Sequence, residues 1–332
     1  MTEVVGIRSP IRTTIVYDTY WRFAAERQRA FFRRLANEAP YTADPILGHH
    51  RFTNAYRAAD RVSQYLVRNV IYEGSITCVD DVFFRTVLFR VFNRIDTWRD
   101  LSRSVGPITW AGYDFTRYDD LLTTALSRGR RIYSAAYIMP SRSGKLDSRR
   151  KHRNHLRMIE MMMAASLPER LRDARSAETA FNLLREFPLI GDFLAYQLLT
   201  DLNYSPLLSF SEMDFVVAGP GALSGIRKCF SDTGGLPAAD LIRLVAESQC
   251  DEFERREIEF ESLWGRPLQL IDCQNLFCEV DKYARVAHPE FTGPRGRSRI
   301  KQRYKPDDAP LRVWFPPKWN LNDRIPKSLL AA

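Results

Sequence analysis

The chain has 332 residues and a formal net charge of +9, with 45% hydrophobic and 27% charged residues. These values exclude a disordered tail and provide for two or three packed units. No run approaches the roughly 18 apolar residues of a membrane span, and the N-terminal residues lack the basic-then-apolar order of a signal peptide, so we expect a cytoplasmic protein with no membrane partner.

Apolar residues recur mostly at spacings of three and four, which is the period of a helix. Strand signals are short and isolated, so we predict an all-α or nearly all-α fold. The periodicity predicts helices at 20–37, 52–70, 81–95, 116–128, 148–165, 176–187, 191–203, 222–232, 237–262 and 267–286.

Two of these predicted helices carry a polar stripe opposite apolar residues. At 100° per residue, Asn54, Arg57 and Arg61 lie within about 60° of one another on the helix 52–70. Four residues within about 80° form the stripe on the helix 267–286: Asp272, Asn275, Glu279 and Lys282. Exposed helix faces often have this composition, so each stripe is either a solvated face or part of a binding site.

Basic residues are concentrated in two stretches. Residues 128–157 contain ten basic residues and one acid, and residues 295–327 contain ten basic residues and three acids. The predicted helix 237–262 is acidic in compensation. Of the 49 basic residues 41 are arginine, which binds phosphate oxygens bidentately, although codon composition also produces such a bias. The segregation indicates a surface for nucleic acid or, less specifically, a solvated face.

Motifs for metals and nucleotides are missing from the sequence. The segment SRSGKLDS at 141–148 does not fit the phosphate-loop pattern GxxxxGK[ST], because the first Gly is absent and Leu146 follows Lys145. The five cysteines include no CxxC pair, and the five histidines have no metal spacing. We therefore expect no disulfide scaffold, no metal, no cofactor and no nucleoside triphosphate.

Residues 186–214 have the order of a hairpin of two helices followed by an acid. A helix ends at Phe187-Pro188, Gly191 permits a turn, and Asp214 follows 23 residues later. This order resembles the helix-hairpin-helix DNA glycosylases, in which the hairpin offers backbone N–H groups to a DNA phosphate. Leu189 stands where the first hairpin Gly belongs, and Phe193 stands where bifunctional members carry a Schiff-base Lys. The resemblance therefore implies hydrolysis without strand cleavage.

Four blocks in order give a resemblance that covers most of the chain. The blocks are RFTNAYRAADR at 51–61, LFRVFNR at 88–94, DLNY at 201–204 and DCQNLFCEVDKY at 272–283. They look like the α-glutamyl/putrescinyl thymine pyrophosphorylase family. That family is related to the helical domain of 5-hydroxymethyluracil DNA kinases, is similar to helix-hairpin-helix glycosylases, and includes anti-phage glycosylases that remove modified bases.

The resemblance implies a two-lobed helical domain at 1–286 and a basic tail at 287–332. Lobe A would span about 15–130 and lobe B about 150–286, with the base pocket between them. A flipped base needs aromatic surfaces and amides that read its edge. We predict that the pocket residues are Phe52, Asn54, Tyr56, Arg57, Phe92, Asn93, Asn275, Glu279, Lys282 and Tyr283. We predict that DNA-backbone contacts come from Ile190, Gly191, Arg94, Arg149, Arg150 and Arg153. Asn93-Arg94 could equally be an ordinary helix cap.

The main functional prediction is a monofunctional DNA glycosylase that removes a modified pyrimidine from double-stranded phage DNA, plausibly in anti-phage defence. A carboxylate beside the anomeric carbon would stabilise the oxocarbenium ion and align water. We choose Asp214, with Glu212 next and Asp281 third, although Asp214 could simply cap the following segment. One alternative is a phage hypermodification enzyme that transfers a group on pyrophosphorylated 5-hydroxymethyluracil in DNA. Another is a catalytically silent DNA-binding module.

Overall fold

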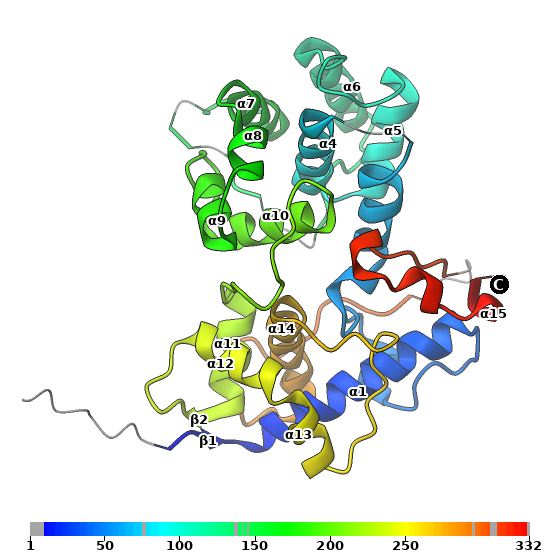
Figure 1. Cartoon of the computed structure of the whole chain (residues 1–332), viewed down its shortest axis with the longest axis vertical. Helices are drawn as coiled ribbons and strands as arrows, with labels where there is room; N and C mark the ends of the chain where they lie inside the picture. The colour runs from blue at the N-terminus through cyan, green and yellow to red at the C-terminus, as the bar shows by residue number, and fades with distance from the viewer. Residues whose placement is uncertain are drawn as a thin grey trace, which may run out of the picture. The chain divides into compact units, whose positions relative to one another are not determined.

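The computed structural model describes residues 10–74, 78–135, 139–141, 143–144, 146–293, 296–305 and 311–330. Three basic residues counted above, Arg142, Lys145 and Arg295, lie outside these residues. The described chain is mostly helical with one small two-stranded sheet, which confirms the prediction of a nearly all-α fold (Figure 1). Among its described helices, none is long and apolar enough to cross a membrane.

Contacts divide the chain into two compact units, which we describe separately. Unit 1 combines the residues through Asp60 with Phe215–Val313 and the segment from Trp319 onward. Unit 2 combines Arg61–Asp214 with Trp314–Lys318. Each unit is assembled from segments far apart in the chain, whereas the lobes that we expected are each contiguous.

Unit 1 is built around α14 (Leu270–Ala287), which α1, α2, α11 and α12 contact. Gly225 brings α11 against α14 so closely that a Cβ there would lie 2.0 Å from the Phe277 carbonyl oxygen. Strands β1 and β2 pair antiparallel, with Arg12 opposite Asp232 and Thr13 opposite Phe230. The other elements of unit 1 are α1 (Ile15–Leu35), α2 (Pro45–His49), η1 (Arg57–Ala59), α11 (Pro220–Cys229), α12 (Ala238–Glu247), α13 (Gln249–Arg255), η4 (Asn322–Arg324), α15 (Lys327–Leu330), β1 (Arg12–Thr13) and β2 (Phe230–Asp232).

Unit 2 is built around α4 (Val79–Phe92), in which every residue from Val82 to Phe92 is buried. A helix that is apolar on nearly all sides must be surrounded by others, and η2, α5, α7, α8 and α10 contact α4. The other elements are α3 (Arg61–Tyr65), the π-helical η2 (Leu66–Ile71), α5 (Ile95–Val105), α6 (Phe115–Ser127), α7 (Lys151–Ala164), α8 (Leu167–Arg172), α9 (Ala177–Arg185) and α10 (Asp192–Tyr204). The short η3 (Pro317–Trp319) spans the boundary between the two units.

The predicted helix 52–70 is wrong in its first half. Residues 51–56 are not helical, and regular helix begins at Arg61. The cause is competition from side chains, because Asp60 Oδ1 accepts a hydrogen bond from the Asn54 backbone N–H at 2.8 Å and Asn54 Nδ2 donates to the Ala59 carbonyl at 2.8 Å. Asn54, Arg57 and Arg61 therefore form no stripe on one helix.

The predicted helix 237–262 is interrupted. Helix α12 ends at Glu247, and the Ser248 hydroxyl donates to the Leu244 carbonyl at 2.8 Å. Helix α13 then ends at Arg255, and Glu257 has a left-handed φ of 53°. Two short helices therefore replace one long acidic helix.

The predicted hairpin at 186–192 joins α9 to α10, with a different backbone from the one expected. Gly191 caps α10 with φ −91°, and the left-handed residue is Leu189 with φ 70°. The special conformation therefore falls on Leu189, at the position of the first hairpin glycine, while Gly191 needs no glycine-specific geometry. The structure does not confirm a helix-hairpin-helix glycosylase fold.

Candidate functional site

The four sequence blocks meet in two pairs, one in each unit. In unit 1, residues 51–60 of the first block lie on the block 272–283 of α14. In unit 2, the block 88–94 at the end of α4 binds the block 201–204 at the end of α10. The most recognisable residues of the sequence therefore hold together segments that are more than 100 residues apart.

Carboxylates of α14 fix the loop 51–60 by its backbone. The Thr53 N–H donates to Glu279 Oε2 at 3.0 Å, and the Arg57 N–H donates to Asp272 Oδ1 at 2.8 Å. Asp272 also accepts from the Gln269 N–H at the start of the helix. Two acids of the predicted α14 stripe thus position the loop through charge-assisted hydrogen bonds.

Arg27 of α1 joins the same loop from its other side. Its Nε donates to the Thr53 carbonyl at 2.9 Å, and its Nη2 donates to Asn54 Oδ1 at 2.5 Å. Burial, together with Glu279, raises the pKa of the nearby Asp60 to about 6, against the opposing effects of the Asn54 N–H and Arg27. The Asn54 side chain thus forms hydrogen bonds with both Arg27 and the Ala59 carbonyl.

Lys282 lies where aromatic and basic groups converge. Its Nζ donates to Glu279 Oε2 at 2.6 Å and to the Arg51 carbonyl at 2.8 Å, and it lies 4.4 Å from the centroid of the Phe52 ring. Phe52 packs against Tyr283, with ring centroids 6.0 Å apart, and Tyr283 Oη donates to Asp44 at 2.6 Å. Five predicted pocket residues of unit 1, Phe52, Asn54, Glu279, Lys282 and Tyr283, thus lie around one loop.

The remaining predicted pocket residues of unit 1 are placed differently. Arg57 and Tyr56 are almost fully buried, and Tyr56 Oη donates to the Arg266 carbonyl at 2.5 Å. Asn275 is half-buried on α14 and accepts from Gln274. These residues therefore contribute to the packing of unit 1 more than to its surface.

A buried ion pair joins α4 to α10 in unit 2. Arg90 binds Asp201 bidentately, with Nη2 at 2.8 Å from Oδ1 and Nε bonded to Oδ2. Its Nη1 donates to Asn93 Oδ1 at 2.7 Å, and Asn93 ends α4 in the left-handed conformation with φ 49°. Asn93 is thus a helix cap whose amide oxygen is used by Arg90.

The neighbouring Phe92 packs on Tyr133, with ring centroids 5.1 Å apart. Tyr133 Oη lies 2.7 Å from His155 Nδ1, and His155 Nε2 lies 2.8 Å from the Pro140 carbonyl. Because a carbonyl only accepts, Nε2 carries the proton and Nδ1 accepts from Tyr133. Burial lowers the pKa of His155 to about 4, so the ring is neutral near pH 7.

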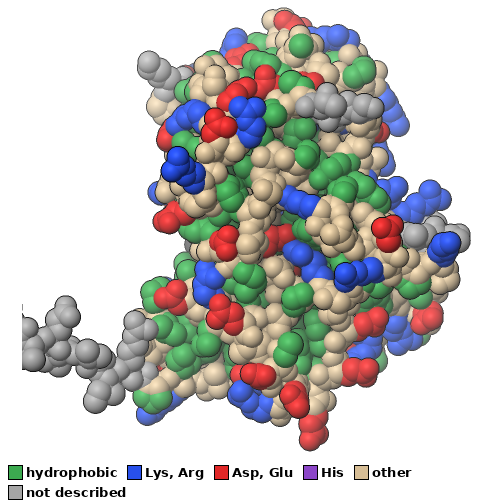
Figure 2. All heavy atoms as spheres, in the orientation of Figure 1, with side chains coloured by type: hydrophobic (Ala, Val, Ile, Leu, Met, Phe, Trp, Pro, Cys, Tyr) green, Lys and Arg blue, Asp and Glu red, His purple; other side chains and the backbone are tan. Residues whose placement is uncertain are grey.

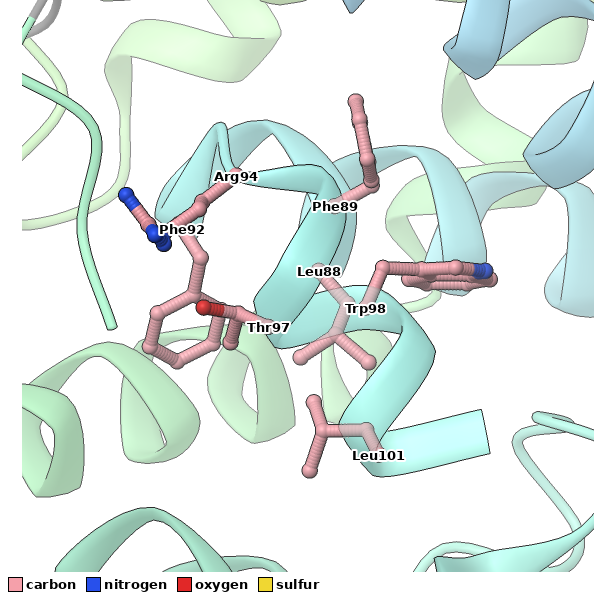
Figure 3. A pocket seen from close by; sticks show the side chains of 7 residues that line it. All are labelled: Leu88, Phe89, Phe92, Arg94, Thr97, Trp98 and Leu101. Atoms are coloured by element: carbon pink, nitrogen blue, oxygen red, sulfur yellow. The ribbon is translucent and has the colours of Figure 1, made fainter. Parts of the chain in front are cut away.

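A small pocket in unit 2 lies between α4 and α5 (Figure 3). Its lining is mainly apolar: Leu88, Phe89, Phe92, Arg94, Thr97, Trp98 and Leu101. The Thr97 hydroxyl donates to the Ile132 carbonyl at 2.9 Å. The pocket therefore offers little with which to read the edge of a base.

The residues predicted to contact the DNA backbone have varied surroundings. Arg149 and Arg150 are exposed just before α7. Arg153 binds Asp119 bidentately at 2.7 to 2.9 Å. Burial raises the pKa of Asp119, but Arg153 and His152 outweigh this effect, so the pKa is lowered. Arg94 pairs with Asp96 at 2.6 Å. Ile190 is buried, and Gly191 is exposed at the start of α10.

Two of the acids chosen for catalysis, Asp214 and Glu212, lie in a turn at the end of unit 2. The Asp214 N–H donates to the Ser211 carbonyl at 3.2 Å, and its side chain is exposed. Glu212 is half-buried in the same turn. Asp281 is buried in unit 1, where it binds Ser224 at 2.7 Å and Arg285 at 2.5 Å. Asp214 and Glu212 therefore belong to unit 2, whereas Asp281 belongs to unit 1.

Sequence reasoning missed several partners of these residues. Asp60, Arg90 and Asp201 lie inside the sequence blocks that carry the resemblance, and this could have marked them as candidates. No sequence pattern marks Arg27 or Asp119, because only the fold brings them to their partners. Among the described residues, no group of three or more His, Cys, Asp or Glu side chains is placed to hold a metal ion.

Comparison with known proteins identifies the family. Residues 14–293 match the family model described as 5-hmdU DNA kinase, helical domain. The chain is 25% identical over 325 residues to a 5-hmdU DNA kinase of Bacillus phage SP10, which covers 91% of this chain and 50% of that protein. No solved structure matches. The chain belongs to the family of the 5-hmdU DNA kinase helical domain, and it spans about half the length of the curated relative.

This finding overturns the prediction of a DNA N-glycosylase. The relative is named a kinase, which is a transferase and not a hydrolase of glycosidic bonds. The role that we gave to Asp214 and Glu212 depended on glycosidic hydrolysis and is withdrawn with it. A kinase also draws its phosphoryl group from a nucleoside triphosphate, so the relative's name opposes our expectation that none is involved.

Proposed function

We propose that this chain is a transferase of DNA hypermodification that acts on the 5-hydroxymethyl position of 5-hydroxymethyluracil in DNA. The observation that carries the proposal is the match of residues 14–293 to the 5-hmdU DNA kinase helical domain, because that range contains all four sequence blocks. The sequence contains no GxxxxGK[ST] phosphate loop. We therefore favour transfer on an already pyrophosphorylated base.

The proposed reaction is a substitution at the exocyclic methylene carbon. An amine nitrogen forms a bond to that carbon, the carbon–oxygen bond breaks, and pyrophosphate leaves with the bonding electron pair. The amine then loses one proton to a base. Such a reaction needs cations for the departing pyrophosphate and an acceptor for the proton.

Helix α14, at the loop 51–60, offers both kinds of group. Lys282 is a cation on the half-buried edge of an aromatic cluster, and Glu279 is a carboxylate 2.6 Å from its Nζ. Burial lowers the pKa of His50, and His49, Arg303 and Lys282 add to this effect, which supports a basic environment there. We assign pyrophosphate binding to Lys282, proton acceptance to Glu279, and support of the base to Phe52 and Tyr283.

A second candidate is phosphorylation of the 5-hydroxymethyl group itself. The phage relative is named a 5-hmdU DNA kinase, which favours this reaction. In that case a nucleoside triphosphate donates its γ-phosphoryl group to the hydroxymethyl oxygen, which loses its proton. The donor would then bind without a phosphate loop of the GxxxxGK[ST] type.

Duplex oligonucleotides with one modified base distinguish these candidates. The base is thymine, 5-hydroxymethyluracil or its pyrophosphorylated form, and each duplex is incubated with either an amine such as putrescine or glutamate, or a γ-labelled nucleoside triphosphate. We expect an amine adduct and an equal amount of pyrophosphate from the pyrophosphorylated base only. Label transfer to 5-hydroxymethyluracil would favour the kinase, and no conversion in any arm would contradict the proposal.

Variants of Lys282 test the assigned site. Lys282→Met should slow conversion by about 10- to 100-fold, since a hydrogen bond to a charged group contributes about 1.5 to 3 kcal/mol. Lys282→Arg should recover part of the rate, and Lys327→Met, at an exposed lysine of α15, should retain it. Equal rates for Lys282→Met and Lys327→Met would remove Lys282 from the site.

A further inference from the structure

Basic residues alternate along one segment of the C-terminal region. In the sequence RSRIKQRYK at 297–305 every second residue is basic: Arg297, Arg299, Lys301, Arg303 and Lys305. All five are exposed, and the segment contains no acid. Ile300, at an intervening position, is buried in unit 1.

The segment is held on unit 1 by its backbone. The Arg51 N–H donates to the Gln302 carbonyl at 3.0 Å, and the Tyr304 N–H donates to the His49 carbonyl at 3.0 Å. These bonds flank an antiparallel bridge between His50 and Arg303. Arg285 of α14 also donates to the Arg299 carbonyl at 3.4 Å. The segment 297–305 is therefore a docked part of unit 1, next to the loop 51–60.

The alternation suits a polyanion with regular charge spacing. In extended backbone, residues two apart point to the same side and are separated by about 6.7 Å. One strand of duplex DNA carries one phosphate for about every 3.4 Å of helix axis. A segment aligned with the axis would thus present one basic side chain for about every two phosphates of a strand.

The position of the segment connects it to the proposed site. The bridge at His50 directly precedes the loop 51–60, and Lys282 donates to the carbonyl of Arg51, whose N–H holds the segment. Figure 2 shows basic and acidic side chains mixed on the face that it draws. The segment 297–305 differs from that mixture, because its sequence has five basic residues and no acid.

We propose that the segment 297–305 binds the phosphate backbone of the DNA duplex that carries the modified base. This inference rests on the proposed function, because DNA as the partner comes from it. The segment supplies affinity that is independent of sequence, while the loop 51–60 with Lys282 and Tyr283 selects the base. Phosphate contacts set register and orientation on a duplex, and they carry no sequence information themselves.

The test measures binding to a fluorescent 20-base-pair unmodified duplex across a salt series. One variant of the full chain replaces all five basic residues of the segment with Gln. The slope of log K against log salt is negative, and each lost phosphate contact reduces its magnitude by about 0.9. We expect the magnitude to decrease by at least about 2.7, which corresponds to three contacts. Affinity near 100 mM salt should fall at least about tenfold.

Two further variants separate charge from folding. Lysine at Arg297, Arg299 and Arg303 keeps the charge and should keep the slope within about one contact of the wild-type value. A matched control replaces five exposed arginines outside the segment with Gln: Arg12, Arg22, Arg172, Arg175 and Arg227. The decrease in the magnitude of its salt slope should be less than half of the decrease in the segment variant.

An unchanged slope in the segment variant would overturn the inference, as would an equal loss in the control. Tighter binding of an RNA duplex of the same sequence would overturn the choice of DNA. Failure of the proposed function gives a different result. In that case the segment variant loses affinity for unmodified DNA while the wild-type chain converts no modified base. Conversion of the base together with an unchanged salt slope would reject only the segment.

Discussion

Arg90 and Asp201 use their charges to join two buried helices of unit 2. Asp201 is fully buried and Arg90 is 4% exposed, and the bidentate geometry leaves both charges matched. Removing one partner leaves an uncompensated buried charge, which costs about 3 to 5 kcal/mol. The pair therefore fixes how α4 meets α10 and, through Asn93, where α4 ends.

We expect Asp201→Leu to lower the free energy of unfolding by about 3 to 5 kcal/mol, as measured by urea denaturation. The double variant Arg90→Met with Asp201→Leu should recover part of that loss, because it removes both charges. Asp96→Ala, which breaks the exposed pair with Arg94, should change the stability by less than about 1 kcal/mol. A loss below that value in Asp201→Leu would contradict this account of the pair.

Asp60 gives unit 1 a pH-dependent stability. Because the pKa of Asp60 is raised from 3.8 to about 6, chiefly by burial, the folded chain binds a proton more tightly than the unfolded chain does. The resulting stabilisation is present in full below about pH 4 and is lost as the pH rises through about 6.

The difference in unfolding free energy between wild type and Asp60→Asn isolates this contribution. Asn retains an oxygen to accept from the Asn54 N–H but does not titrate. Relative to the variant, the wild type should lose of the order of 1 to 3 kcal/mol between pH 4 and pH 7. If the wild type instead gained stability relative to the variant between pH 4 and pH 7, the carboxylate would be stabilised in the folded chain, which contradicts the prediction.

At the scale of elements, the contact of α11 with α14 depends on Gly225. A Cβ there would lie 2.0 Å from the carbonyl oxygen and 2.7 Å from the carbonyl carbon of Phe277, and backbone atoms cannot move aside as a flexible side chain does. The two helices would have to separate, which leaves space between them along the core of unit 1.

Gly225→Ala should therefore lower the free energy of unfolding by about 1 to 3 kcal/mol, the range for overpacked cores. The control Gly48→Ala lies in α2, where a Cβ would meet nothing within 4 Å, and it should be neutral or slightly stabilising. Thermal or urea unfolding of both variants tests the prediction. Equal stability of the two variants would mean that α11 has room to shift.

Periodicity predicted the long helices better than the segments that lie between them. The predicted helices 116–128, 191–203 and 267–286 correspond to α6, α10 and α14 within a few residues. Helix α5 was not predicted, although Asn93-Arg94 was already a candidate cap at the end of the preceding helix. The loop 51–60 was taken as a helix because its fixing groups, Arg27 and Glu279, come from other elements.

The candidate site was partly accessible from the sequence for a similar reason. Glu279, Lys282 and Tyr283 share one helix, so their proximity follows from spacing alone. The approach of Phe52 to Tyr283 and of the segment 297–305 to residues 49–51 depends on chain topology. The blocks 51–61 and 272–283 carried the family resemblance. Many of their polar side chains form hydrogen bonds to the backbone and therefore also stabilise the fold.

For the whole molecule, we propose that the chain changes a substituent on a pyrimidine and leaves its glycosidic bond intact. The family of the matched domain supports a transferase, and the basic segment 297–305 supports a nucleic-acid partner. The first conclusion comes from relatives, and the choice of DNA as the partner of the segment rests on it. The charge and exposure of the segment come from the sequence and from unit 1.

The most direct test is intact-mass spectrometry of an oligonucleotide with one pyrophosphorylated 5-hydroxymethyluracil after incubation with the chain and an amine. We expect a single product whose mass equals the oligonucleotide plus the amine minus pyrophosphoric acid, with every base retained. An oligonucleotide that lacks the base and carries an abasic site would contradict it.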